Sequence, residues 1–150
     1  MIVGMNGAND GAVLFGTPAE FHHIGIACKH LDRETAAYTA LGYTVERADF
    51  EDPQQGVRGR FLIGGGPRLE LLVELVSGTV LAPWLRRGIR QYHLAWQTPY
   101  FEEAFERAVA ARARVVVEPV PAVAFDQRLI TFLMMPNLQM IELIQAPPSA

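Results

Sequence analysis

The sequence has almost no cysteine and no concentration of charge. Cys28 is the only cysteine among 150 residues, so an intrachain disulfide is impossible, which fits a reducing compartment. The 13 basic and 16 acidic side chains give a formal charge of −3, and no block of like charge occurs. Because nucleic-acid-binding surfaces are usually basic patches, we expect no nucleic-acid partner and favour a small molecule.

Long hydrophobic runs are also missing. No apolar stretch approaches the roughly 18 to 20 residues that a helix needs to span a bilayer. The N-terminal residues lack the basic region of a secretory signal. We therefore expect no membrane partner and a cytoplasmic location.

Length and hydrophobic content predict one domain. Half of the residues are hydrophobic, which is enough for one core in a chain too short for two ordinary domains. Residues 1–19 are rich in Gly, Ala and Asn without usable periodicity, and they predict a flexible N-terminal tail. The single domain is then expected at 20–146, with modules at about 20–76 and 91–146, a linker at 77–90 and a C-terminal tail at 147–150.

What the sequence does contain is a pair of residues that occurs twice. His23 lies in an apolar run, and Glu70 follows 47 residues later in a second apolar run. His93 and Glu142 repeat this arrangement 49 residues apart. Such a recurrence indicates a duplicated unit, and we expect each copy to supply half of one four-ligand metal site.

Hydrophobic periodicity and turn residues predict the same order of elements, β-α-β-β-β, in both modules. The first module is expected to have a strand at 21–28, a helix from Asp32 to Gly42, and strands at 43–47, 57–63 and 68–76. The second is expected to have a strand at 91–97, a helix from Pro99, and strands at 114–118, 128–134 and 138–145. A short helix at about 81–87 is expected in the linker. The predicted class is α+β, with two tandem βαβββ modules forming a curved mixed sheet around a central metal cleft.

The alternation of side chains along a strand explains how the four residues could meet. Glu70 and Leu72 share one face of their strand, while Leu69 and Leu71 share the other. If a pseudo-twofold axis relates the modules, two imidazoles and two carboxylates face one another across a concave sheet. This donor set suits one divalent ion, namely Zn, Ni, Co, Mn or Fe.

A single histidine in an apolar strand is more often a packing residue than a metal ligand. The coincidence of His and Glu in both halves is what supports the metal hypothesis. His22 and His30 have no counterparts in the second half, so we interpret them as structural or exposed.

Four short motifs follow one another along the chain, namely His23–Ala27, Leu69–Leu72, Tyr92–Trp96 and Met140–Leu143. Together they resemble the vicinal oxygen chelate superfamily, which is also named for glyoxalase, bleomycin resistance proteins and extradiol dioxygenases. Within the superfamily, the sequence looks most like methylmalonyl-CoA epimerase-like and glyoxalase-like proteins, in which a segment similar to Pro83–Gly88 precedes the second histidine motif. The resemblance implies a homodimer and one divalent metal ion. It also implies the metal ligands, which are His23, Glu70, His93 and Glu142.

The chain departs from the epimerases at three places. Glu70 stands where they have Gln, which makes the ligand set more like that of glyoxalase I. Gly59 stands where they have a second catalytic Glu, and Met135–Asn137 replaces a His-Pro-Lys segment. These departures count against epimerase activity on a coenzyme A thioester.

The resemblance implies a metal-dependent isomerase, epimerase or lyase that removes a proton next to a carbonyl. Glu142 is the first candidate for the base and Glu70 the second, because a carboxylate in an apolar site is more basic than in water. Two further groups are candidate substrate-binding residues. The first, Arg86, Arg87 and Arg90, would clamp a substrate carboxylate or phosphate, with a solvated cationic loop as an equal alternative. The second group could line the substrate pocket and consists of Phe61, Trp96, Phe132 and Met134. We expect at least half of these four to be ordinary core residues.

Other functions stay open. Dioxygenases and transferases of this superfamily use two His and one Glu, so the additional Glu70 argues against them. A small-molecule-binding or resistance protein without catalysis is a different class, and such proteins generally lack the metal ligands. An inactive scaffold that keeps a metal is the remaining alternative, because of Gly59.

Overall fold

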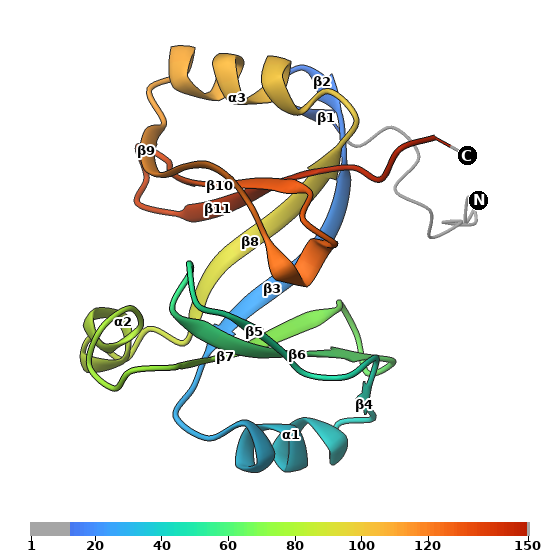
Figure 1. Cartoon of the computed structure of the whole chain (residues 1–150), viewed down its shortest axis with the longest axis vertical. Helices are drawn as coiled ribbons and strands as arrows, with labels where there is room; N and C mark the ends of the chain where they lie inside the picture. The colour runs from blue at the N-terminus through green and yellow to red at the C-terminus, as the bar shows by residue number, and fades with distance from the viewer. Residues whose placement is uncertain (1–12, 150) are drawn as a thin grey trace, which may run out of the picture.

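In the computed structural model, which describes residues 13–149, one nine-stranded mixed sheet runs through both halves of the chain (Figure 1). The elements of the first half are β3 (Glu20–Ala27), α1 (Leu31–Thr39), β4 (Thr44–Val45), β5 (Phe50–Asp52), β6 (Val57–Ile63) and β7 (Leu69–Glu74). The linker contains α2 (Ala82–Arg86). The elements of the second half are β8 (Gln91–Thr98), α3 (Phe101–Ala110), β9 (Arg114–Pro121), the 3-10 turn η1 (Val123–Phe125), β10 (Leu129–Met134) and β11 (Met140–Gln145).

The strand order shows that the two halves are copies of one unit. The sheet runs β4-β6-β7-β3-β8-β11-β10-β9, so each half reads the same from the centre outward. β3 and β8 pair antiparallel at the centre, and each pairs in parallel with the last strand of its own half, β7 or β11. A pseudo-twofold axis between β3 and β8 therefore relates the modules, as predicted, and the α+β class with two βαβββ modules is confirmed.

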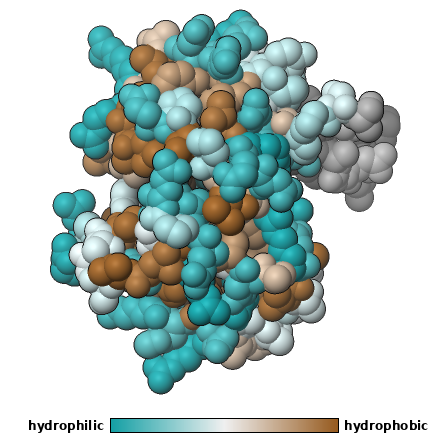
Figure 2. All heavy atoms as spheres, in the orientation of Figure 1, coloured by the Kyte–Doolittle hydropathy of each residue, from teal (hydrophilic) through white to brown (hydrophobic). Residues whose placement is uncertain are grey.

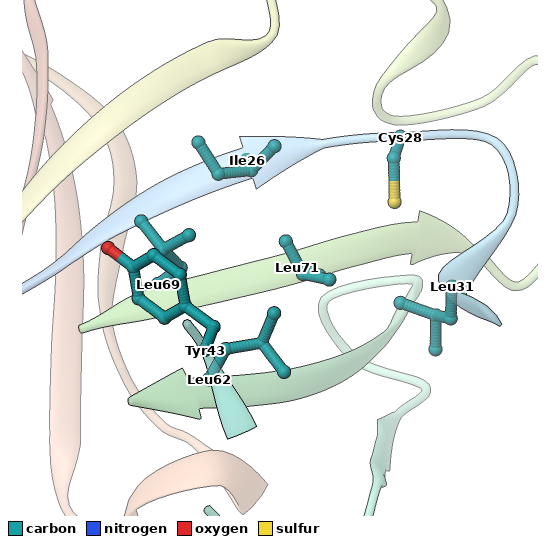
Figure 3. Packing of buried hydrophobic residues seen from close by; sticks show 7 residues of the cluster. All are labelled: Ile26, Cys28, Leu31, Tyr43, Leu62, Leu69 and Leu71. Carbon is teal, nitrogen blue, oxygen red and sulfur yellow. The ribbon is translucent and has the colours of Figure 1, made fainter. Parts of the chain in front are cut away.

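The helices cover the outer face of the sheet in each half. Figure 1 shows α1 and α3 at opposite ends of the molecule with the strands between them. Leu69 and Leu71 of β7 pack towards Leu31 of α1 in a buried cluster that Figure 3 shows. In the second half, Ile141 packs with Ala108 of α3. The opposite face of each last strand, which carries Glu70 or Glu142, is thus left for the interior between the halves.

Two parts of the fold differ from the expectation. Val13–Leu14 (β1) and Thr17–Pro18 (β2) form a short hairpin, whose Pro18 carbonyl accepts a hydrogen bond from Thr98 Oγ1 at 2.7 Å. The sequence predicted a flexible tail here, whereas the structure pairs Val13–Leu14 with Thr17–Pro18 and places this hairpin against β8 and α3. The rest of that tail, 1–12, lies outside the described residues. The strand β5 is an unpredicted addition, and it pairs with the edge of β6.

Hydrophobic residues also reach the surface. On the face seen in Figure 2 they gather over both halves of the molecule. Val80 and Val116 are among the exposed ones, at 38% and 45% of their full accessibility. No helix among residues 13–149 is long and apolar enough to cross a membrane.

Candidate metal centre

Each of the four predicted ligand residues lies opposite a small residue of a central strand. In the register of the strands, Gly25 of β3 lies between His93 of β8 and Glu70 of β7. Ala95 of β8 lies in the same way between His23 of β3 and Glu142 of β11. A Cβ atom on Gly25 would lie only 2.1 Å from the His93 ring, so glycine is required there for the imidazole to occupy its place. The glycine of the first His-x-small repeat therefore has a steric cause.

A bulge precedes each histidine. The register of β3 and β8 shifts between Phe21 and His23 and again opposite Tyr92, so His22 and Tyr92 are the additional residues. Each of these residues places its ring edge-to-face against the ligand histidine that follows, at an interplanar angle of 84° in both cases. Tyr92 is thus the structural counterpart of His22, which the sequence comparison of the two halves did not reveal.

The four side chains meet at one buried point. His23 Nε2 lies 2.9 Å from His93 Nε2, and Glu142 Oε2 lies 3.2 Å from both nitrogens. Glu70 Oε1 lies 3.4 Å from His23 Nε2 and 3.5 Å from His93 Nε2. At most 4% of any of the four residues is exposed. Their donor atoms all lie within 4.8 Å of one another.

The electrostatics of this cluster favour a positive charge at its centre. Burial lowers the pKa of His23, but Glu70 and Glu142 outweigh burial and raise it to about 9. The pKa of His93 is raised in the same way, against the effect of burial. Burial would raise the pKa of Glu70, yet the two imidazoles hold it well below its usual range. The carboxylates therefore stabilise either protons on the imidazoles or a cation between them.

The residues fit a divalent metal ion. Bonds of about 2.0–2.2 Å from one ion to nitrogen and oxygen ligands place neighbouring ligand atoms about 3.0–3.5 Å apart, as found here. Glu142 Oε2 is buried and has no hydrogen-bond partner among the described residues, although it lies beside both imidazoles. A shared ion would satisfy this oxygen, which no protein donor reaches in suitable geometry.

His22 holds one of the two imidazoles. Its Nδ1 lies 2.8 Å from Nδ1 of His23, on the side of that ring away from the other ligands. Burial, followed by the charge of His23, lowers the pKa of His22 to about 3, so its ring is neutral and can accept a hydrogen bond. His23 Nδ1–H then donates to His22, which leaves the lone pair of Nε2 for a metal. His93 Nδ1 has no such partner among the described residues.

A cavity of about 580 Å³ opens beside the cluster, between the two halves. Glu70 and Glu142 lie in its wall, and the two histidines lie behind them. Tyr92 lies in the wall too, and burial, with the nearby charges of Glu70 and Glu142, raises its pKa well above 10, so the phenol stays protonated. We call this space the central cavity. Its volume is in the usual range for a small-molecule site.

The predicted arginine clamp lies elsewhere. Arg86, Arg87 and Arg90 are all absent from the wall of the central cavity. Arg90 forms an ion pair with Glu34, and Arg86 borders a separate cavity with Cys28 and His30. The linker thus places none of the three in the wall that contains Glu70 and Glu142.

The four predicted aromatic and methionine residues have different positions. Phe132, opposite Glu142 in β10, lines the cavity, whereas Phe61, opposite Glu70, is fully buried against His23. Trp96 packs on the α3 side, because it is an odd number of residues from His93 along the strand. Met134, at the end of β10, is not in the wall.

Gly59, at the position where epimerases have a second catalytic Glu, is covered by a ring. Phe50 of β5 lies opposite Gly59 in the register, and a Cβ atom on Gly59 would lie 2.1 Å from that ring. Phe50 also lines the central cavity. An apolar surface thus stands where a second base would be.

Several wall and support residues were missed from the sequence. They are Gly25, His22, Tyr92, Phe50, Trp84 and Phe125. Two signals in the sequence could have found the first three, namely the aromatic ring that precedes each predicted ligand histidine and the small residue two positions after it. Phe50, Trp84 and Phe125 lie in the short elements β5, α2 and η1, which belong to no repeated motif of the sequence.

Comparison with known families agrees with this geometry. Residues 22–132 match the family described as Glyoxalase/Bleomycin resistance protein/Dioxygenase superfamily. This range includes three of the four predicted ligand residues. The chain belongs to this superfamily, as its four motifs suggested. No curated protein matches the sequence.

Solved structures share the fold at modest identity. A hypothetical protein, BH1468 from Bacillus halodurans C-125, superposes with a TM-score of 0.75 at 24% identity, over 89% of this chain and 99% of its own. A methylmalonyl-CoA epimerase from Mycobacterium tuberculosis gives 0.73 at 23% identity, over 92% and 93%. One from Streptomyces coelicolor, in complex with 2-nitronate-propionyl-CoA, gives 0.71 at 27% identity, over 85% and 97%.

Proposed function

We propose that this protein is a divalent-metal-dependent isomerase, epimerase or lyase that removes a proton next to a carbonyl of a small molecule. One observation carries the proposal. Two imidazoles and two carboxylates converge at a buried point, and both carboxylates border a cavity large enough for a substrate. Neighbouring structures include epimerases, which carry out chemistry of this class.

The ion would be held by all four residues, which are His23, Glu70, His93 and Glu142. Two nitrogen and two oxygen donors suit Zn, Ni, Co, Mn or Fe. When bound, the ion would bind substrate oxygen and stabilise the negative charge that develops there during proton removal. The two carboxylates offset its charge, so a loaded site is neutral overall.

Glu142 is the proposed base. Its side chain lies in the cavity wall, and a carboxylate that detaches from the ion could accept a proton there. The substrate C–H proton would pass to this carboxylate, and the electron pair of the broken bond would move to the carbonyl oxygen as an enolate. Return of the proton to either face of the carbon completes the reaction.

Glu70 is the second base, because it borders the same cavity from the other half of the molecule. With the Phe50 ring covering Gly59, no carboxylate can extend from that position. The chemistry at the inner end of the cavity therefore depends on Glu70 and Glu142. This arrangement supports glyoxalase I-like chemistry. It fits less well with the epimerases, which have a second catalytic Glu at the position of Gly59.

Metal analysis of the purified protein tests the site directly. We expect about one divalent ion per chain, because a single set of four donors is shared by both modules. A His23→Ala, Glu142→Ala double variant should lose the ion and still fold, as judged by circular dichroism. Protein that takes up no divalent ion at neutral pH would contradict the proposal.

Proton exchange tests the reaction. The loaded protein in deuterated water should exchange the α-proton of a carbonyl substrate, which NMR detects as loss of the proton signal. The two probes are a 2-oxoaldehyde hemithioacetal and a 2-methyl-branched thioester. If neither exchanges, both of these substrate classes are excluded.

Two further expectations belong to this proposal. The likeness to the superfamily implies a homodimer, and the composition favours a cytoplasmic location. Sedimentation of the purified chain and fractionation of its host cells would test them.

A further inference from the structure

The wall of the central cavity is mainly apolar and comes from both halves. Val80 and Val116 lie in the wall and are partly exposed, so apolar surface extends to the mouth. Figure 2 shows hydrophobic residues on both halves. Six large side chains make up much of the remaining wall, and these are Phe50, Leu72, Trp84, Tyr92, Phe125 and Phe132.

The charged side chains in this wall are all acidic. Beside Glu70 and Glu142, they are Asp52 and Glu118, and the wall as described contains no Lys or Arg. Asp52 is buried, and its two oxygens accept hydrogen bonds from the backbone N–H groups of Gln55 and Val123, both at 3.1 Å. Glu118 is exposed. Beyond the two candidate metal ligands, the cavity therefore carries only negative charge.

Arginines near the cavity are directed to other partners. Arg47 Nη2 donates to the carbonyl of Ala124 at 2.7 Å, and Arg128 Nη1 donates to that of Gln145 at 2.6 Å. A carboxylate or phosphate in the outer part of the cavity, away from the metal ligands, would thus lose water without gaining a basic side chain, which is strongly unfavourable. The neighbouring Asp52 and Glu118 would repel it as well.

We infer that the substrate of this site is an uncharged, largely apolar carbonyl compound. The inference rests on the proposed function, since the carbonyl oxygen would need the ion. It separates this chain from its structural neighbours, one of which was solved with a coenzyme A derivative. Apolar contact with rings such as Phe132 and Trp84 would supply most of the binding free energy.

Two matched chelators test the inference. Benzohydroxamic acid and 4-carboxybenzohydroxamic acid share two chelating oxygens and a ring, and they differ by one distal carboxylate. Co²⁺-loaded protein reports their coordination by its visible absorption, and a titration gives each Kd. We expect the carboxylate to weaken binding about tenfold or more, because it meets apolar and acidic groups.

A pair of charge variants, one in the cavity wall and one outside it, tests whether the acidic wall causes the difference in affinity. Glu118→Lys should narrow the difference between the two probes, whereas Glu106→Lys, an exposed acid on α3 outside the cavity wall, should leave it unchanged. Equal affinities, or tighter binding of the carboxylate, would overturn the inference while the metal site stands. A protein that takes up no Co²⁺ would instead overturn the proposed function and this inference together.

Discussion

At the residue scale, the candidate centre depends on one histidine that is not itself a ligand. His22 contacts His23 through their Nδ1 atoms at 2.8 Å, and its own ring is neutral because burial lowers its pKa to about 3. The contact fixes which nitrogen of His23 carries the proton. Its counterpart Tyr92 makes an edge-to-face contact with His93 and leaves His93 Nδ1 without a partner in the described chain.

Replacing His22 should weaken metal binding. We expect His22→Phe to raise the metal Kd roughly 10- to 100-fold, because it removes the acceptor that orients His23. His22→Asn, which keeps an acceptor, should lose less. Competition with a chromophoric chelator measures each Kd, and His30→Phe, at an exposed position, is the matched control. An unchanged Kd in His22→Phe would show that His22 only packs.

The protonation of His23 should make stability depend on pH. Its folded-state pKa of about 9 exceeds the ordinary 6.5, so its contribution is fully present below pH 6.5 and is lost as the pH rises through 9. Metal-free protein should therefore become less stable between pH 6.5 and 9. The metal takes the place of the proton, so loaded protein should show a flatter profile.

Thermal unfolding across this pH window, in EDTA and in saturating Zn²⁺, checks the expectation. The lowered pKa of Glu70 does not interfere, because its contribution is lost only as the pH falls into the acid range. Equal slopes with and without Zn²⁺ would contradict a metal at His23.

At the scale of elements, the pairing of β3 with β8 creates the site. The antiparallel register places Gly25 beside His93 and Ala95 beside His23, and the two bulges turn His22 and Tyr92 against the same rings. The outer strands β7 and β11 then add one Glu each in parallel register. The four candidate ligand residues thus come from four neighbouring strands with no loop contribution, and strands hold side chains more rigidly than loops do.

A methyl group at Gly25 should disturb this pairing. Gly25→Ala would place its Cβ within 2.1 Å of the His93 ring, so the imidazole must move. We expect metal affinity to fall about tenfold or more, in line with the effect of misplacing a ligand. Isothermal titration with Zn²⁺ measures the change.

The equivalent position in the other half supplies the control. Ala95→Gly removes bulk beside His23 rather than adding it, so it should retain metal binding and lose only about 0.5–1 kcal/mol of folding stability. If Gly25→Ala binds Zn²⁺ as well as the natural protein does, the steric role of Gly25 is wrong.

At the scale of the whole molecule, the two halves share one site and one cavity. Asp52 of the first half accepts a hydrogen bond from Val123 of the second, and Arg47 donates to Ala124, so polar contacts also join the halves around the cavity. Because the cavity lies between modules, its lining combines residues from both. Duplication alone would give two identical sites, whereas the central pairing joins the half-sites into one.

A double-mutant comparison tests this sharing. His23 belongs to the first half and Glu142 to the second, and they lie 3.2 Å apart. Each single Ala variant should lose most of the metal affinity, and the double variant should lose less than the sum of the two effects, because residues of one site couple. Metal titration of the four proteins gives the coupling. Additive losses, or two ions per chain in the natural protein, would indicate independent sites.

The sequence by itself determined the order of the elements and the four residues that converge. Both follow from local patterns: alternating side chains commit Glu70 and Glu142 to one face, and the repeat of His and Glu marks equivalent strands. The N-terminal hairpin and β5 escaped prediction because tertiary contacts, rather than their own periodicity, order them.

Only the tertiary structure decided what surrounds these four residues. It placed the arginines of the linker away from the cavity, covered Gly59 with Phe50, and set His22 against His23. These relations join segments that are distant in sequence or turned by bulges, and no local pattern encodes them. The character of the cavity, apolar and acidic, depends on which side chains from the two halves face each other, and chain packing alone sets that.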